Sequence, residues 1–288
     1  MDVLIGPFID NGFMVRALVA GVLVAVACAV IGTFVVLRGL AFIGDALAHG
    51  VLPGIAAAIL LGLPGMLGAA VGAVVMIGGV TLVTNRSRLS SDTAIGLLFV
   101  AMLALGVVIV SATGAFQGDL LAILFGQILG TSIDQLLVMA AATLVVVTVA
   151  IVAARPFLLL SFEPEQADVA GFPSRRYHTL MMLLVALTVV VAFQTVGTLL
   201  VFGMLLAPAA SGALLANRIS SMMVIGTLVG WLSTYLGLLA SYWFDIAASA
   251  TIVLVAVTIF FAVLALTNLR APRQPGGGTD PATGETVA

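Results

Sequence analysis

The sequence predicts an all-α, polytopic membrane protein, and three observations lead to this class. The chain has 288 residues, of which 62% are hydrophobic and only 8% are charged, whereas a soluble domain has about 25% charged residues. Apolar stretches of about 20 residues, the length that crosses a bilayer, recur along the chain. They are continuously apolar, unlike the alternating strands of a membrane barrel. We therefore expect helices, which satisfy their own backbone hydrogen bonds in lipid.

Nine segments are long and apolar enough to span a membrane. They are Val15–Leu37, Phe42–Leu61, Met66–Thr84, Thr93–Thr113, Gln135–Ala154, Thr179–Phe193, Gly197–Ala216, Ile219–Trp243 and Ile246–Leu269. The break at Gln194–Val196 is barely polar, so a merger of its two neighbours would leave eight spans. We expect residues 1–270 to form one transmembrane domain. Residues 271–288 are rich in Gly, Pro and Thr and predict a disordered cytoplasmic tail.

The positions of the arginines predict the orientation, because cytoplasmic loops collect basic residues. With nine spans, a single side of the membrane receives Arg38, Arg86, Arg88, Arg155, Arg175, Arg176, Arg218, Arg270 and Arg273. Only Arg16 falls on the other side. This arrangement predicts an external N-terminus and a cytoplasmic C-terminus.

All ten basic residues are arginine, and the chain contains no lysine. A phosphate-binding P-loop uses its lysine to reach the β- and γ-phosphates of a nucleotide. The chain therefore cannot carry an ordinary P-loop ATPase site, and any ATP-driven process would need a separate ATPase chain.

The second span contains the residues with the strongest indication of chemistry. Asp45 and His49 are four residues apart and share one helix face. Ionisable residues inside spans are costly and are functional candidates, and a carboxylate with an imidazole suits manganese, zinc or iron(II). Pro53 and Gly54 favour a bent or broken helix of the kind that lines transporter sites. The alternative is structural: Asp45 would cap its helix, and His49 would be a satisfied core histidine.

The segment from Ser161 to Tyr177 is the longest internal polar stretch, and we expect it to be cytoplasmic. Glu163 and Glu165 lie at a predicted helix start, where acids favour the helix dipole. Ala167 and Gly171 are small and four residues apart, a face that could seat in a groove of a partner. The alternative is a loop helix that only covers the ends of the spans.

Three further polar or helix-bending residues have structural interpretations. Arg38 is expected to anchor the cytoplasmic end of the first span, with a salt bridge to Asp45 as an alternative. His178 lies at the predicted membrane boundary and reads as an interfacial residue. Pro208 is expected to bend its span and could shape a pathway.

Three ordered motifs closely resemble those of the permease subunits of ABC-type manganese, zinc and iron importers. The first runs from Val36 to Gly54 and contains Asp45-Ala46-Leu47-Ala48-His49 and Leu52-Pro53-Gly54. The second is Val196-Gly197-Thr198-Leu199-Leu200-Val201 followed by Leu206-Ala207-Pro208-Ala209-Ala210, and the third is the segment from Phe162 to Pro173. The resemblance covers Arg16 to Leu269. Ala48 departs from the family, where serine is frequent.

The resemblance implies a multi-pass protein of the cell membrane that imports a divalent transition metal by alternating access and is not itself an enzyme. Asp45 and His49 would form the intramembrane metal site, and Glu163–Gly171 would engage the ATPase subunit. The implied partners are that ATPase, an extracytoplasmic metal-binding protein and a second copy of the chain, within membrane lipid. We expect no nucleic-acid partner and no permanently bound cofactor, the transported metal being manganese, zinc or iron.

Three alternatives stay open from the sequence. Asp45 and His49 could form a proton relay in a secondary transporter. A permease for a bulky metal chelate would need a wide pathway. An intramembrane hydrolase is disfavoured because the chain has neither His-Glu-x-x-His nor Gly-x-Ser-x-Gly and only two histidines.

Overall fold

The computed structural model describes residues 6–9, 11–113 and 126–270, and the predicted tail lies outside them. In this part of the chain every regular element is helical. The elements are α2 (Gly12–Leu37), α3 (Ile43–Gly50), α4 (Leu52–Leu60), α5 (Gly65–Arg86), α6 (Ser91–Thr113), the short 3-10 helix η1 (Ile128–Gly130), α8 (Ile133–Val152), α9 (Ala154–Phe162), α10 (Pro164–Val169), α11 (Ser174–Leu215), α12 (Ile219–Phe244) and α13 (Ala248–Arg270).

The predicted count of nine spans is confirmed within the described residues. The second span, Ile43–Leu60, consists of α3 and α4. The weakly polar break is also real: α11 runs through it but is interrupted at Gly197, with φ 80° and ψ 165°. Such a conformation is costly for residues with a Cβ and open to glycine. Gly197 thus divides α11 into the spans Ser174–Phe193 and Val196–Leu215.

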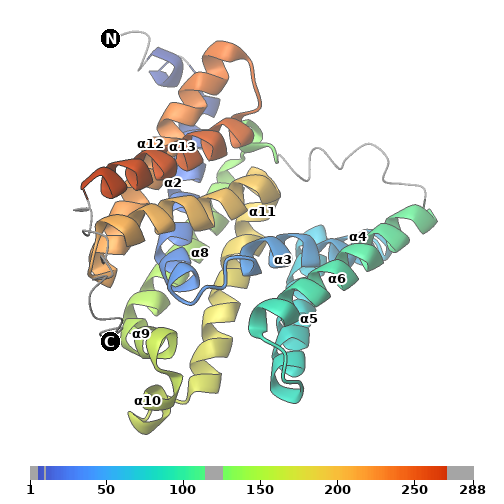
Figure 1. Cartoon of the computed structure of the whole chain (residues 1–288). Coiled ribbons are helices and arrows are strands. Elements are labelled where there is room, and N and C mark those ends of the chain that lie inside the picture. The colour runs from blue at the N-terminus through green and yellow to red at the C-terminus, as the bar shows by residue number, and fades with distance from the viewer. Residues whose placement is uncertain (1–5, 10, 114–125, 271–288) are drawn as a thin grey trace, which may run out of the picture.

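The helices form two packed groups (Figure 1). In the first, which we call the bundle, α2 packs against α8, α11 and α12, and α13 packs against α11 and α12. In the second, which we call the arm, α3, α4, α5 and α6 pack against one another. The arm contacts the bundle where α3 and α5 meet α11.

The bundle is closely packed around α2. A Cβ at Gly32 would collide with the carbonyl oxygen of Leu205 in α11, so the two helix backbones touch there. Two residues further along α2, Phe34 is fully buried and packs edge-to-face on Phe157 of α9, with ring centroids 5.2 Å apart. The bundle therefore combines close backbone approach with large buried side chains.

The helix α2 ends where Gly39 adopts a left-handed conformation, with φ 66°. The amide of Gly39 donates to Val36 and that of Leu40 donates to Val35, which is the Schellman pattern of helix termination. This turn leaves Arg38 at the end of α2 and directs the chain into the arm.

Glycines bring the helices of the arm together. Gly54 in α4 packs directly on the backbone of Gly68 in α5, and a Cβ at Gly72 would lie 2.9 Å from the Cα of Val51. The Gly68-x-x-x-Gly72 spacing therefore serves helix packing, as such spacings do in membranes.

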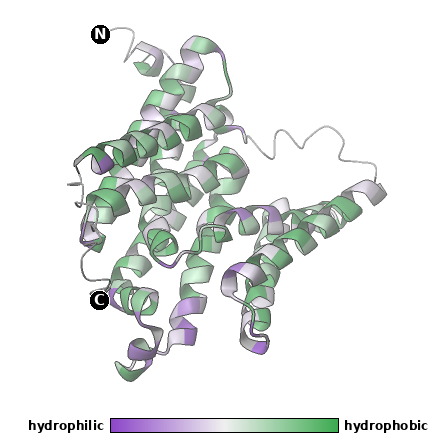
Figure 2. Cartoon of the chain, in the orientation of Figure 1, coloured by the Kyte–Doolittle hydropathy of each residue, from purple (hydrophilic) through white to green (hydrophobic). Residues whose placement is uncertain are grey.

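The surface is apolar over the spans and polar at their ends (Figure 2). Hydrophilic residues gather where α9, α10 and the start of α11 lie and around the turn between α5 and α6. Lipid-facing helices are apolar on their outer sides too: Val100 and Val107 of α6 are both about 60% exposed. This pattern is that of a multi-pass protein of the cell membrane.

Candidate functional site

The helix α3 turns one face toward its neighbours and leaves Asp45 and His49 on the other. Ile43, Gly44, Ala46, Leu47, Ala48 and Gly50 are all buried. Gly44 lies against Leu205 of α11, and Gly50 lies against Met76 of α5. Because these contacts fix the helix on two sides, the side chains of Asp45 and His49 remain 34% and 21% exposed, respectively.

Asp45 and His49 form a pair, as the i, i+4 spacing predicted. The Oδ1 atom of Asp45 lies 3.4 Å from the Nε2 atom of His49. Ligand bonds of about 2.1 Å leave two donor atoms on one ion roughly 3.0 to 3.5 Å apart. Both atoms could therefore bind the same metal ion with little movement.

A second helix of the arm, α6, contacts the imidazole of His49. Phe99 of α6 packs edge-on, with ring centroids 5.7 Å apart. The Nδ1 atom of His49 is buried and has no hydrogen-bond partner among the described residues. Phe99 could not be predicted as a neighbour of His49 from the sequence, because an aromatic residue in an apolar span is most often a packing residue.

The structural alternative for Asp45 is not what the chain adopts. The N-cap of α3 is Phe42, and no side chain caps this helix. Asp45 lies inside the first turn, so its carboxylate is free to bind a ligand. No group of three or more His, Cys, Asp or Glu side chains gathers in the described parts of the chain, so a metal at this pair would have at most these two side chains of that kind as ligands there.

The predicted helix interruption lies at Val51, between α3 and α4. Pro53 occupies the first turn of α4 and is buried, and Gly54 makes the contact with Gly68. Pro208 lies inside α11, and its carbonyl oxygen lies close to Gly226 of α12. Pro53 and Gly54 thus lie beside the pair, whereas Pro208 lies in the bundle.

The predicted coupling segment forms the short helix α10, followed by a turn. Glu163 is the N-cap residue, and both Glu163 and Glu165 are exposed. The expected small-residue face is wrong in detail. Ala167 is 1% exposed within the chain, while Gly171 lies beyond the end of α10 with φ 83°. The exposed face of α10 instead carries Glu165 and Val169, the latter 90% exposed.

The turn after α10 is fixed by Asp168. Its carboxylate accepts hydrogen bonds from the backbone amide of Ser174 at 2.7 Å and from the Ser174 hydroxyl at 2.9 Å. These two bonds, the amide first, lower the pKa of Asp168 below its usual value. The segment is therefore held at the start of α11.

Arg38 pairs with a residue that the sequence did not connect to it. Its Nη1 atom lies 2.7 Å from Nδ1 of His178. Since a guanidinium can only donate, Nδ1 accepts, and the proton of the neutral ring is on Nε2. Arg38 thus ties the end of α2 to α11, in place of the salt bridge to Asp45 that the sequence allowed.

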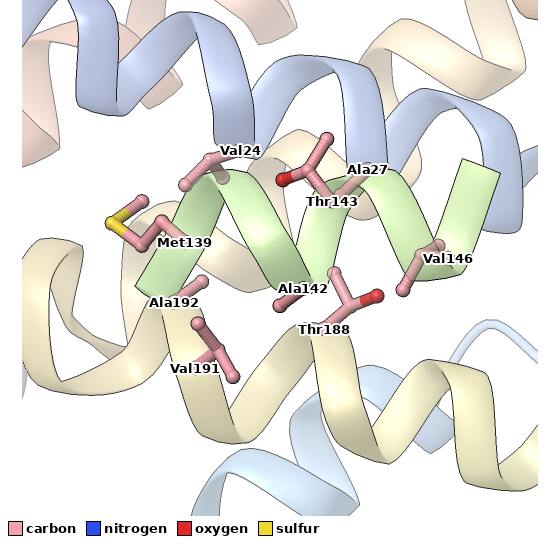
Figure 3. A pocket seen from close by; sticks show the side chains of 9 residues that line it. All are labelled: Val24, Ala27, Met139, Ala142, Thr143, Val146, Thr188, Val191 and Ala192. Carbon is pink, nitrogen blue, oxygen red and sulfur yellow. The ribbon is translucent and has the colours of Figure 1, made fainter. Parts of the chain in front are cut away.

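A cavity between α2, α8 and α11 has no functional chemistry (Figure 3). It measures only about 10 Å³, and its lining is apolar apart from Thr143 and Thr188. Both hydroxyls already donate to backbone carbonyls, of Leu23 and Leu184 respectively. A space of this size holds at most one water molecule, so we interpret it as a packing defect.

The fold and the pair define a class: a polytopic helical membrane protein with ionisable side chains inside a broken span, the arrangement of transporters. The ABC 3 transport family model matches residues 10–267. The chain is 40% identical over 266 residues to the manganese transport system membrane protein MntC of Halalkalibacterium halodurans, covering 92% of this chain and 90% of that one. It is 36% identical to the chelated iron transport system membrane protein YfeD of Yersinia pestis, over 90% and 86% of the two chains.

A solved structure, PsaBC from Streptococcus pneumoniae in complex with Fab, is similar to the whole fold. The TM-score is 0.80 at 33% identity, over 91% of this chain and 94% of the other. The chain therefore belongs to the ABC 3 transport family. It is a transport permease, as predicted, and the hydrolase interpretation is set aside.

Proposed function

We propose that this chain is the permease subunit of an ABC importer for a divalent transition metal, with manganese as the first candidate. The observation that carries the proposal is the Asp45–His49 pair, whose oxygen and nitrogen atoms lie 3.4 Å apart on the open face of α3. Manganese favours oxygen ligands and accepts imidazole, and a relative of 40% identity is named for manganese transport. The relative named for chelated iron transport makes iron the second candidate.

In the proposed mechanism, an extracytoplasmic binding protein delivers the ion to Asp45 and His49. Water and backbone carbonyls would complete its coordination shell. Because a charged carboxylate and a neutral imidazole bind the ion, protonation of either group weakens binding. Alternating access then exposes the pair to the cytoplasm.

We propose that a separate ATPase supplies the energy for the alternating-access movement and that it contacts the segment from Glu163 to Gly171. In this segment the exposed residues Glu165 and Val169 are the candidate contacts, while Ala167 supports α10 from inside and Gly171 makes the turn. Two copies of the chain, each with one such segment, would serve two ATPase subunits. The arginine-rich side would face the cytoplasm.

The test is the manganese, zinc and iron content of cells that express the chain with its ATPase and binding protein. Wild type is compared with Asp45→Asn, His49→Ala and Asp92→Asn, after checking that each reaches the membrane in equal amount. Asp92 is a matched control, because it is also an acid in the first turn of a span but is exposed. We expect one metal to accumulate, the two site variants to lower the accumulation at least about tenfold, and Asp92→Asn to retain it.

Each other outcome would favour one of the alternative interpretations. Unchanged accumulation in both site variants would show that the pair is structural. Uptake that survives an inactive ATPase but stops with a protonophore would favour the proton-coupled transporter. A response only to a chelated metal would favour the chelate permease.

The coupling segment has its own test, the amount of ATPase that copurifies with the chain. Glu165→Arg and Val169→Asp change exposed residues of α10 and should reduce it. Arg155→Gln, in α9, is the control and should not. Equal recovery with all three variants would exclude the face of α10 as the contact.

A further inference from the structure

A second polar site lies between the arm and the bundle, at the arginine-rich end of the spans. It is an open cavity of about 300 Å³, at the lower end of the range of ligand pockets. The arm supplies Thr81 and Thr84 from α5 and Ser91 from α6. The bundle side supplies Arg38, Leu160, Ser174, Arg175 and His178.

The lining of this cavity is rich in hydrogen-bond donors and contains no carboxylate. Arg38 and Arg175 carry positive charge. His178 accepts from Arg38 through Nδ1 and so keeps its Nε2–H as a donor. The carboxylate of Asp168, which is bound to the lining residue Ser174, already accepts hydrogen bonds from the amide and hydroxyl of that residue.

Thr84 provides an independent observation that points to a ligand. Its hydroxyl is one of two buried side-chain atoms in the described residues without a hydrogen-bond partner, the other being Nδ1 of His49. Thr81, one turn earlier, donates to the carbonyl of Ile77. A buried hydroxyl without a partner costs free energy. A rotation of the Thr84 side chain toward the cavity, which it lines, would let a bound acceptor remove that cost.

We propose that this cavity binds a phosphate group of net negative charge, either the headgroup of an anionic phospholipid or free phosphate. Guanidinium groups bind phosphate oxygens through charge-assisted, often bidentate hydrogen bonds. Basic pockets between spans on the cytoplasmic side suit anionic headgroups. A phosphate here would contact α5 and α6 on one side and α2 and α11 on the other, and so would hold the arm against the bundle. This inference does not depend on the proposed transport function.

The test uses the full chain, purified alone in detergent and stripped of lipid. The melting temperature is followed while phosphatidylglycerol or phosphatidylcholine is added in mixed micelles. Inorganic phosphate is compared with chloride at equal ionic strength. We expect phosphatidylglycerol to raise the melting temperature and phosphatidylcholine to have no such effect. If inorganic phosphate alone reproduces the rise, the site takes free phosphate.

Arg175→Gln and Arg176→Gln form a matched pair, because both remove one exposed arginine in the first turn of α11 but only Arg175 lines the cavity. Arg175→Gln should raise the half-saturating concentration of the anion about tenfold, because one charge-assisted hydrogen bond is lost. Arg176→Gln should leave that concentration unchanged. Thr84→Val, which keeps the net charge, should also weaken binding. Equal responses of Arg175→Gln and Arg176→Gln, or no response to either anion in wild type, would overturn the proposal.

Discussion

The bundle and the arm differ in whether their buried polar side chains have hydrogen-bond partners. In the bundle, the buried hydroxyls of Thr33, Thr188, Ser211 and Thr234 each donate to the carbonyl four residues earlier in the same helix. In the arm, the buried Nδ1 of His49 and the buried hydroxyl of Thr84 have no partner among the described residues. Both unsatisfied atoms thus lie in the smaller of the two groups.

We interpret this difference as a division of roles, in which the bundle stabilises the fold and the arm carries residues of the proposed ligand sites. A buried polar group is normally paired, and an unpaired one calls for a specific explanation. Thr84 lines the proposed phosphate site, where a bound phosphate would give its hydroxyl an acceptor. His49 would bind the metal through Nε2, so its Nδ1 atom stays unpaired on the side that faces the arm. Among the described residues of the bundle, no buried side-chain nitrogen or oxygen atom lacks a hydrogen-bond partner. The bundle provides the surface of α11 on which the arm rests.

The largest expected effect tests the bundle core. Phe34→Ala removes a fully buried ring packed on Phe157 and should lower the free energy of unfolding by about 3–5 kcal/mol. Val107→Ala, on the lipid-facing side of α6, should change it by less than about 0.5 kcal/mol. Reversible unfolding in mixed SDS–detergent micelles measures both. Equal losses would contradict the division into a packed bundle and an exposed arm surface.

The next effect concerns backbone contact. Gly32→Ala places a methyl group on the carbonyl of Leu205 and should cost about 1–3 kcal/mol or more. Gly96→Ala in α6 has open space around it and should be neutral or stabilise by up to about 1 kcal/mol through helix propensity. The same unfolding measurement compares them, and a destabilising Gly96→Ala would show that α6 has a neighbour in the assembled protein.

A smaller effect, of opposite sign in the two regions, sharpens the comparison. Thr33→Val removes a hydrogen bond of 2.8 Å in the bundle and should destabilise by about 0.5–1.5 kcal/mol. Thr84→Val removes an unsatisfied hydroxyl and should be neutral or stabilising in lipid-stripped protein. If Thr84→Val destabilises as much as Thr33→Val, the Thr84 hydroxyl has a partner and the contrast fails.

The smallest effect lies outside both regions, at the turn between α10 and α11. Because the pKa of Asp168 is lowered in the folded chain, its bonds to Ser174 contribute stability above the ordinary aspartate pKa of about 3.9. This contribution is lost as the pH falls through the lowered pKa. Hydrogen exchange of the 163–177 segment should be faster in Asp168→Asn than in wild type at pH 7. The two proteins should converge in acid, and a difference that persists there would refute the assignment.

The spans were predictable because each is a local property of about 20 residues. The Asp45–His49 pair was predictable for the same reason, since one helix turn joins the two. Even the weak break before Gly197 was visible, although the sequence alone could not decide between one long helix and two. The left-handed backbone at Gly197 decides it.

The contacts that link distant parts of the chain were not predictable. Arg38 and His178 are 140 residues apart, and the sequence offered only Asp45 as a nearby partner for Arg38. The role of Ala167 was misjudged because spacing alone does not tell which side of a short helix faces its own chain. Phe99 carried no polar signal, and only the packing of α6 on α3 brings it to His49.

The kink at Gly197 divides α11 into two helical segments. The first segment contacts α10 at its start, and the second lies against Gly44 of α3 through Leu205 and Phe202. A tilt that begins at α10 and passes along α11 therefore crosses Gly197 before it reaches α3. A substitution that restricts the backbone at position 197 would change how a movement of α10 is passed to α3. The residues of α10 and α3 would themselves stay unchanged.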